Sequence, residues 1–215
     1  MMKNQSQKFG LVSASMLFIG LPVLLYATGD YPRRSILKES ISILTLLGFC
    51  LILAQFFLAR SNNNLLGGYN MRKAIKLHKI IGYIFTSILL VHPFSLVVPR
   101  YFEAGVDPVD GFITIVSTYG NFGVMSGLIA WCLMLLLLTT AYFRDKISLS
   151  YKSWRLVHGL LSIVFIVFAS WHAIDLGRHV NLVLSTYITL LATVGILILF
   201  KIYLRQSVVR VGKFK

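Results

Sequence analysis

The chain has 215 residues, of which 57% are hydrophobic and only 13% are charged, and its mean hydropathy is +0.78. These values exclude an ordinary soluble domain and predict a protein that has lipid as its solvent. The formal net charge of +14 could indicate a nucleic-acid partner, but the positions of the basic residues argue against one.

Six uncharged apolar runs follow one another along the chain, at residues 9–28, 41–58, 80–98, 121–143, 156–174 and 180–200. Each approaches the ~20 residues that a helix needs to cross ~30 Å of hydrocarbon, and none alternates as a barrel strand would. The first run follows Lys3 and Lys8, but its length and its lack of a small-residue cleavage pattern favour a membrane helix over a signal peptide. The longest connection covers residues 99–120. We expect an all-α integral membrane protein, a six-transmembrane-helix bundle, with residues 1–215 as a single domain.

The basic residues are divided unequally between the two ends of these helices. With the amino terminus inside, 16 of the 21 Lys and Arg residues fall on the inner side, among them Arg72, Lys73, Lys76, Lys79, Lys152 and Arg155. This positive-inside bias predicts that both termini are cytoplasmic, in a multi-pass protein of the cell inner (plasma) membrane. The positive charge then reflects topology and contact with lipid rather than nucleic-acid binding.

Four of the five histidines lie in the third and fifth runs. KLHKIIGYIFTSILLVHPF contains His78 and His92, and RLVHGLLSIVFIVFASWHAI contains His158 and His172, with a spacing of 14 in both. Fourteen helical residues fall about 40° short of four turns and span ~21 Å. Each helix therefore presents one imidazole near each membrane surface, on nearly the same face.

The third and fifth helices run in the same direction because one helix lies between them. Depth then pairs His78 with His158 at the cytoplasmic level and His92 with His172 at the outer level. Two facing imidazoles without a third protein ligand suit a flat macrocycle with both axial positions filled, whereas zinc requires three or four converging ligands. We predict two b-type haems with these four histidines as iron ligands. A six-coordinate iron favours electron transfer, so no residue is expected to be catalytic.

Other readings of these residues remain open. Buried histidines also serve in packing or in proton relays, which makes a small transporter or proton channel the non-redox alternative. Gly82 and Gly159 beside the inner pair leave room for a macrocycle, or serve helix packing. Aromatic residues between the histidines could pack on haem or form ordinary core: Tyr83, Phe85, Phe165, Phe168 and Trp171. On the outer side Arg100, Arg178 and His179 are scarce cations, and whether they form a substrate site is not decided by the sequence.

The stretches LHKIIGYIFTSILLVHP, GNFGVMSGLIAWCLMLLLLTTAYFR and YKSWRLVHGLLSIVFIVFASWHA resemble the ferric reductase-like transmembrane domain family, which includes the membrane part of NADPH oxidases and ferric-chelate reductases. The resemblance covers roughly residues 72–172, and it places the haem-binding core at about 72–174. It implies a six-helix core with two b haems, ligated at His78, His92, His158 and His172. It further implies that electrons pass from cytoplasmic flavin to an outer acceptor, such as a ferric chelate, oxygen or a periplasmic redox protein.

The chain departs from the larger members of that family at its carboxyl end. It shows no glycine-rich dinucleotide fingerprint after the sixth run, so we expect flavin on a separate donor, either a cytoplasmic flavoprotein reductase or free reduced flavin. An alternative is the haem-binding membrane subunit of a quinol-linked system, such as periplasmic methionine sulfoxide reductase. Cytochrome b of quinol-oxidising complexes is less favoured, because its ligand helices are the second and fourth of four.

Overall fold

The computed structural model describes residues 10–58 and 71–211, and the regular elements in these ranges are all helices. In chain order they are η1 (Met16–Gly20), α2 (Leu21–Ala27), α3 (Ile36–Leu58), α4 (Met71–Ser95), α5 (Val97–Ala104), α6 (Pro108–Ser117), α7 (Phe122–Tyr142), η2 (Arg144–Lys146), α8 (Tyr151–Leu176) and α9 (Leu182–Val211). Lys3 and Lys8 lie outside the described residues.

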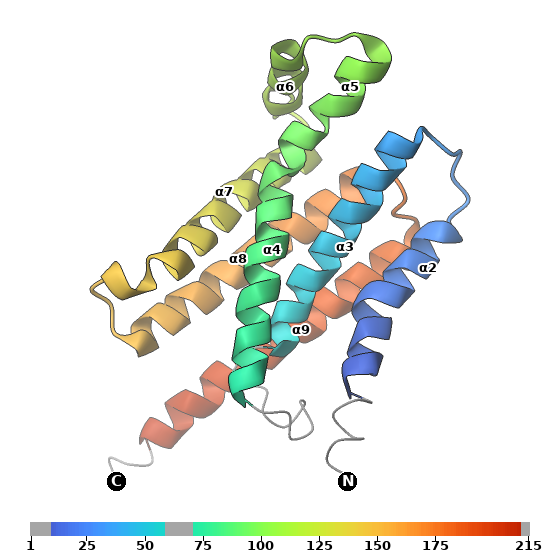
Figure 1. The fold of residues 1–215 in the computed structure, drawn as a ribbon. Coiled ribbons are helices and arrows are strands. Elements are labelled where there is room, and N and C mark those ends of the chain that lie inside the picture. Colours follow the sequence, from blue (N-terminus) through green and yellow to red (C-terminus); the bar gives the residue numbers. More distant parts are fainter. Residues whose placement is uncertain (1–9, 59–70, 212–215) are drawn as a thin grey trace.

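Six helical segments are long and apolar enough to cross a membrane: Gly10–Ala27, Ile36–Leu58, Arg72–Ala104, Phe122–Tyr142, Tyr151–Leu176 and Leu182–Tyr203. The predicted all-α architecture with six spans is therefore confirmed. The start of the first span and the end of α9 lie at the same end of the bundle, opposite α5 and α6 (Figure 1). That arrangement fits an even number of crossings, while the side of the membrane on which this end lies remains a prediction.

The first span is not a uniform α-helix. A π-helix at Met16–Gly20 directly precedes α2, which has Pro22 in its first turn. Proline lacks the N–H of a regular helix and its ring crowds the carbonyl group four residues earlier. The wider turn of a π-helix accommodates that interruption without ending the span.

The segment 99–120, expected as a connection, contains most of α5 and all of α6. Helix α5 ends at Gly105, which adopts a left-handed conformation with φ of 63°. Helix α6 then begins at Asp107, whose side chain accepts hydrogen bonds from the backbone N–H groups of Val109 and Asp110, with Pro108 in the first turn. These are ordinary helix stop and start signals. Helices α5 and α6 have 8 and 10 residues, so neither forms an apolar run of membrane-spanning length.

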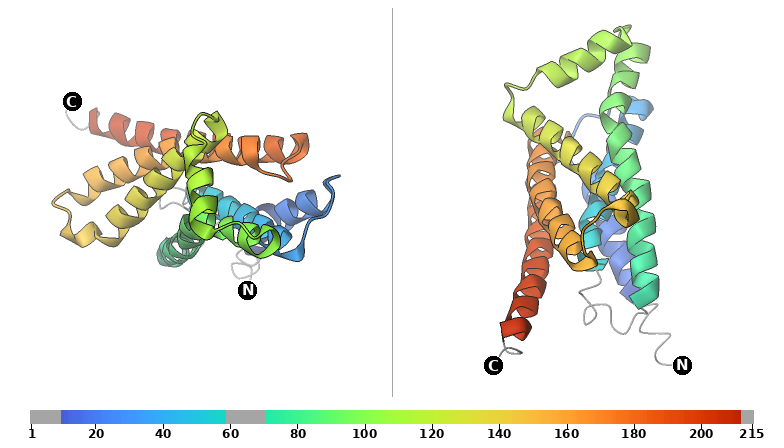
Figure 2. Two further views of the ribbon diagram at one scale, coloured as in Figure 1. Left: turned by 90° about the horizontal axis from the view of Figure 1, so that it is seen from above. Right: turned by 90° about the vertical axis from the view of Figure 1, so that its left-hand side faces the viewer.

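The centre of the bundle lies where α3, α8 and α9 meet. Its fully buried side chains include Cys50 and Leu53 of α3, Ile166 of α8, and Leu184 and Ile188 of α9. Two helical hairpins make up much of the bundle: α3 packs along α4, and α7 packs along α8. Viewed from above, α2 and α3 lie on one side of α4, and α7 and α8 lie on the other (Figure 2). The two helices that carry the histidines thus belong to different hairpins.

Candidate functional site

The four histidines come together as two pairs between α4 and α8. His78 and His158 lie close enough to interact electrostatically, and so do His92 and His172. Both helices run in the same direction through the bundle (Figure 1). Each pair therefore joins residues at the same level along the two helices, one pair some four turns from the other.

The two helices are held apart where the histidines face each other. Over the described residues α4 and α8 form no extended contact, and α7 touches both of them. Directly packed helices lie about 8–10 Å apart, which leaves no room for a macrocycle between their side chains. Across residues 10–58 and 71–211, no three His, Cys, Asp or Glu side chains converge as ligands of a metal ion. The arrangement offers ligand pairs rather than a ligand cluster.

The imidazole of His172 rests on a glycine groove of α7. Its Nδ1 atom lies 2.9 Å from the carbonyl oxygen of Gly123. Gly127, one turn later, is so close to the ring that a Cβ atom there would collide with it, and a Cβ at Gly123 would collide with Asp175. If Nδ1 donates its proton to the carbonyl, Nε2 carries the lone pair that a metal requires. A backbone acceptor thus fixes both the orientation and the tautomer of His172.

Helix α7 is also bonded to α4 near His92. The indole Nε1 of Trp131 donates a 2.9 Å hydrogen bond to the carbonyl oxygen of Leu90, two residues before His92. The Nδ1 atom of His92 is buried and has no hydrogen-bond partner within the described part of the chain. Such an atom is costly unless a ligand or water satisfies it. At this level α7 therefore contacts the His172 ring directly and is bonded to the backbone of α4 two residues before His92.

At the other level, the imidazole of His78 donates a hydrogen bond to the backbone carbonyl group of Gln55 in α3. The Nδ1 atoms of His78 and His158 are both buried and lack partners among the residues that the structure describes, as does Oε1 of Gln55. The ring of His158 is stacked on the indole of Trp154, with centroids 5.0 Å apart and planes 24° apart. At this level both Nδ1 atoms are therefore unsatisfied, with support from α3 on one side and an aromatic ring on the other.

The two glycines singled out from the sequence differ in the structure. A Cβ atom at Gly82 would meet only Gln55 Oε1, at 3.9 Å, so this position leaves space beside His78. Gly159 instead receives the phenol of Tyr203 from α9, whose hydroxyl donates a 3.0 Å hydrogen bond to the carbonyl oxygen of Arg155. Gly159 therefore serves helix packing rather than a macrocycle.

The aromatic residues between the histidines do not form a common lining. Phe165 is buried in the core, whereas Trp171 is 54% exposed and packs edge-on against Phe122. Tyr83 is exposed, and Phe85 and Phe168 pack against the edge of the core. Most of these rings have the positions of ordinary core or lipid-facing residues.

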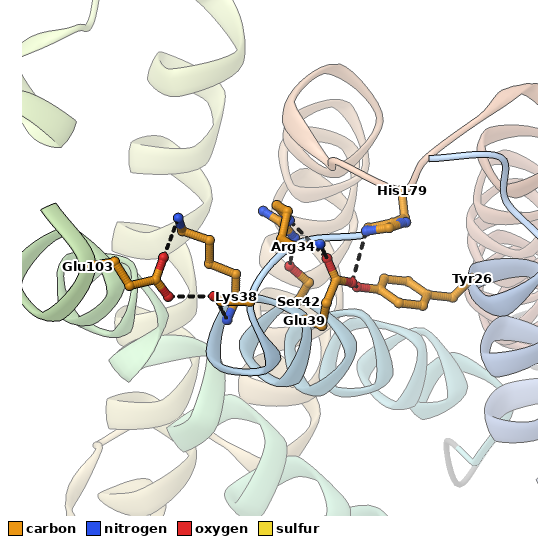
Figure 3. Close-up of polar contacts among 8 residues, drawn as sticks. Tyr26, Arg34, Lys38, Glu39, Ser42, Glu103 and His179 are labelled. Carbon is orange, nitrogen blue, oxygen red and sulfur yellow. Dashed lines mark hydrogen bonds and ion pairs between the residues drawn. The ribbon is translucent and has the colours of Figure 1, made fainter. Parts of the chain in front are cut away.

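His179 lies in the connection between α8 and α9 and belongs to a polar network (Figure 3). Its Nε2 atom lies 3.0 Å from Glu39 Oε2, and its ring packs on Tyr26 with centroids 4.1 Å apart. Glu39 also accepts hydrogen bonds from the Tyr26 hydroxyl and from Arg34 Nε, the latter at 3.0 Å. Arg34 further contacts Ser42 at 2.6 Å. These partners come from α2, α3, the connection between them and the connection after α8, and only His179 had been noted from the sequence.

The position of His179 in this network bears on whether Arg100, Arg178 and His179 form an outer substrate site. His179 is buried, so it is not a surface cation, whereas Arg178 is exposed. Arg100 lies on α5 beside Gly111 of α6. Because its side chain is buried in this network, His179 does not line an exposed surface together with Arg178 and Arg100. Nearby, Lys38 of α3 forms a 2.5 Å ion pair with Glu103 of α5.

The sequence profile of the family described as "Ferric reductase like transmembrane component" matches residues 44–169. That range contains His78, His92 and His158, and His172 lies just past its end. An uncharacterized protein of Archaeoglobus fulgidus is 34% identical over 160 residues, which cover 74% of this chain and 87% of the relative. No solved structure matches the chain.

Proposed function

This chain belongs to the ferric reductase like transmembrane component family, and from that premise we propose that it carries electrons across the membrane through two b-type haems. Family membership and six apolar helices make it a multi-pass membrane protein that takes part in transmembrane electron transfer. What we propose beyond family membership is the presence of two haems, their histidine ligands, the electron donor and the electron acceptor. In this role the chain is the membrane component of an oxidoreductase, with the electron donor on another molecule.

The observation that carries the proposal is the pair of imidazoles at each of two levels between α4 and α8. We assign His78 and His158 as the ligands of one haem and His92 and His172 as the ligands of the other. The Gly123 carbonyl behind His172 gives that imidazole the backing hydrogen bond typical of a metal ligand, and the Nδ1 atoms of the other three histidines are buried polar atoms without protein partners among the described residues, which a bound group or water would have to satisfy. Bound haem would supply an iron that takes up and releases one electron at a time.

The protein's own residues would set the position and surroundings of the two groups. Gly127 gives the His172 ring room against α7, and the Trp131 bond to Leu90 holds α7 against α4. Both levels lie within apolar helices, which exclude water and strengthen any charge interaction there. The spacing of 14 residues places the two levels ~21 Å apart within ~30 Å of hydrocarbon, so two groups cover most of the bilayer.

We place the first level, that of His78 and His158, on the cytoplasmic side of the cell inner (plasma) membrane. The basic residues beside it support this orientation through the positive-inside rule: Arg72, Lys73, Lys76, Lys79, Lys152 and Arg155. The electron donor is then a cytoplasmic flavoprotein reductase or reduced flavin. The acceptor is on the outer face, as a ferric chelate, oxygen or a periplasmic redox protein.

The experiment that tests the proposal is a haem count. The full chain, purified in mild detergent from haem-replete cells, should bind about two haems b, measured by the pyridine haemochrome and by the reduced-minus-oxidised spectrum. A double variant, His78→Ala with His92→Ala, should be colourless and serves as the control. A colourless wild-type protein would contradict the proposal and favour the transporter or channel alternative. One haem per chain would mean that only one of the two histidine pairs binds haem.

A further inference from the structure

A column of rings leads from the first turn of α8 to the inner histidine pair. Tyr151, Trp154 and His158 follow one another at spacings of three and four residues, so they share one face of α8. The rings of Tyr151 and Trp154 are stacked with centroids 6.0 Å apart and planes 29° apart, and those of Trp154 and His158 are 5.0 Å and 24° apart. We call these three residues the ring column. All three residues belong to α8.

The column is fixed at its middle and reaches the protein surface at its far end. Trp154 Nε1 donates a 3.2 Å hydrogen bond to the carbonyl oxygen of Thr140 in α7. The guanidinium carbon of Arg144 lies 5.6 Å from the ring centre of Tyr151 and 5.5 Å from that of Trp154. Tyr151 is 47% exposed, while His158 is part-buried among apolar helices. The column therefore connects the protein surface with a proposed haem ligand.

The surface around Tyr151 is positively charged. The segment 144–155 contains four basic residues and one acidic residue, Asp145. Lys146 and Lys152 are exposed, and the Nε atom of Arg144 is buried without a hydrogen-bond partner in the described part of the chain. An exposed aromatic ring within a field of cations suits a ligand that is planar at one end and carries phosphate at the other. A reduced flavin nucleotide has both features.

We propose that the ring column is the path by which electrons reach the haem held by His158, from a reduced flavin nucleotide that docks over Tyr151 with its phosphate among Arg144, Lys146 and Lys152. The inference rests on the proposed function, because it assumes haem at His158. A flavin hydroquinone that gives up two electrons and two protons becomes oxidised flavin. The haem held by His158 would supply a ferric iron that takes up the electrons one at a time, the protons would pass to water at that face, and the rings of the column would be chemically unchanged. Their π systems shorten the distance that each electron must cross through saturated protein.

A simpler reading is that Tyr151 and Trp154 belong to the aromatic belt of a membrane protein. The two readings differ in what loss of a ring would do, because a belt residue has no part in the reduction of haem. Tyr142 offers a matched control at the same end of α7 and α8. It is 71% exposed and packs on Phe143, outside the column.

The test compares Trp154→Leu with Trp154→Phe in the full, haem-loaded chain. Both variants lose the hydrogen bond to Thr140, but only the first loses the ring. Reduction of haem by reduced flavin mononucleotide, followed by stopped-flow absorbance, should be several-fold slower in Trp154→Leu and near wild type in Trp154→Phe, with unchanged haem content in both. Tyr151→Leu should slow the reduction and also weaken binding of oxidised flavin mononucleotide, measured by quenching of flavin fluorescence. Tyr142→Leu should do neither.

A Trp154→Leu protein with full haem content that is reduced at the wild-type rate would overturn the ring column. If the Trp154→Leu protein loses haem, the Tyr151→Leu variant is used instead. A wild-type rate of haem reduction in Tyr151→Leu would also overturn the ring column. Wild-type protein without haem would instead overturn the proposed function, and the flavin-binding measurement with Tyr151→Leu would still test the docking surface.

Discussion

The Nδ1 atom of His172 in α8 lies 2.9 Å from the carbonyl oxygen of Gly123 in α7. The ring also lies directly against Gly127, where a Cβ atom would overlap it. Replacing Gly127 with alanine should therefore displace His172 and lower the haem content from about two to about one per chain. Gly120→Ala is the control, because a Cβ atom there meets nothing within 4 Å. Full haem content in Gly127→Ala would show that the His172 ring does not need this groove.

The two histidine pairs should be separable by mutation. Replacing His92 or His172 with alanine should remove the same haem and leave the other spectroscopically intact, since four turns of helix separate the levels. Replacing His78 or His158 should remove the remaining one. Redox titration of each variant, followed by absorbance, distinguishes the two haems. If loss of His92 affected the same haem as loss of His158, the pairing by depth would be wrong.

Trp131 should contribute to stability through its bond to Leu90. Trp131→Phe keeps most of the ring but removes the 2.9 Å hydrogen bond between α7 and α4. We expect a loss of about 0.5–1.5 kcal/mol in the free energy of unfolding. Thermal unfolding in detergent measures this change. Trp171→Phe, at a position that is 54% exposed, should have a smaller effect. An equal effect would mean that the hydrogen bond from Trp131 to Leu90 does not contribute to the free energy of unfolding.

Glu39 should matter more than Glu103 for the thermal stability of the bundle. The Glu39 carboxylate accepts hydrogen bonds from Tyr26 and Arg34 and pairs with His179, and these residues come from three parts of the chain. A glutamine would present an NH2 donor group where one of the two carboxylate oxygens now accepts. Glu103 pairs with Lys38 and with Ser35 at an exposed position, where ion pairs contribute little. Glu39→Gln should therefore lower the melting temperature by several degrees and Glu103→Gln by less. The reverse order would contradict this assignment.

Electrons should enter at the end of the bundle that carries the chain termini. Membranes that contain only this protein should oxidise NAD(P)H slowly, and addition of a flavin reductase with flavin should accelerate haem reduction. Sealed, oriented vesicles allow the donor to be offered to one side at a time, with detergent-opened vesicles as the control. Faster reduction from the face opposite the termini would contradict the proposed direction, even with both haems present.

The sequence alone predicted the features that depend on neighbours along the chain. Six continuous apolar runs gave six spans because a helix in lipid must satisfy its own backbone hydrogen bonds. The equal spacing of His78 to His92 and of His158 to His172 fixed their shared faces because the helical period is constant. The short helices α5 and α6 were missed, although Gly105 and Asp107 carried the local signals that end one and begin the other.

Only the tertiary structure decided what surrounds each side chain. It placed the Gly123 carbonyl behind His172, filled the space at Gly159 with Tyr203, and paired His179 with Glu39. These partners lie far apart along the chain and come from different helices. Apolar helices in lipid can be rotated and paired in many ways with similar local energies, so the pairing is set by close packing and interhelical hydrogen bonds formed after the helices assemble.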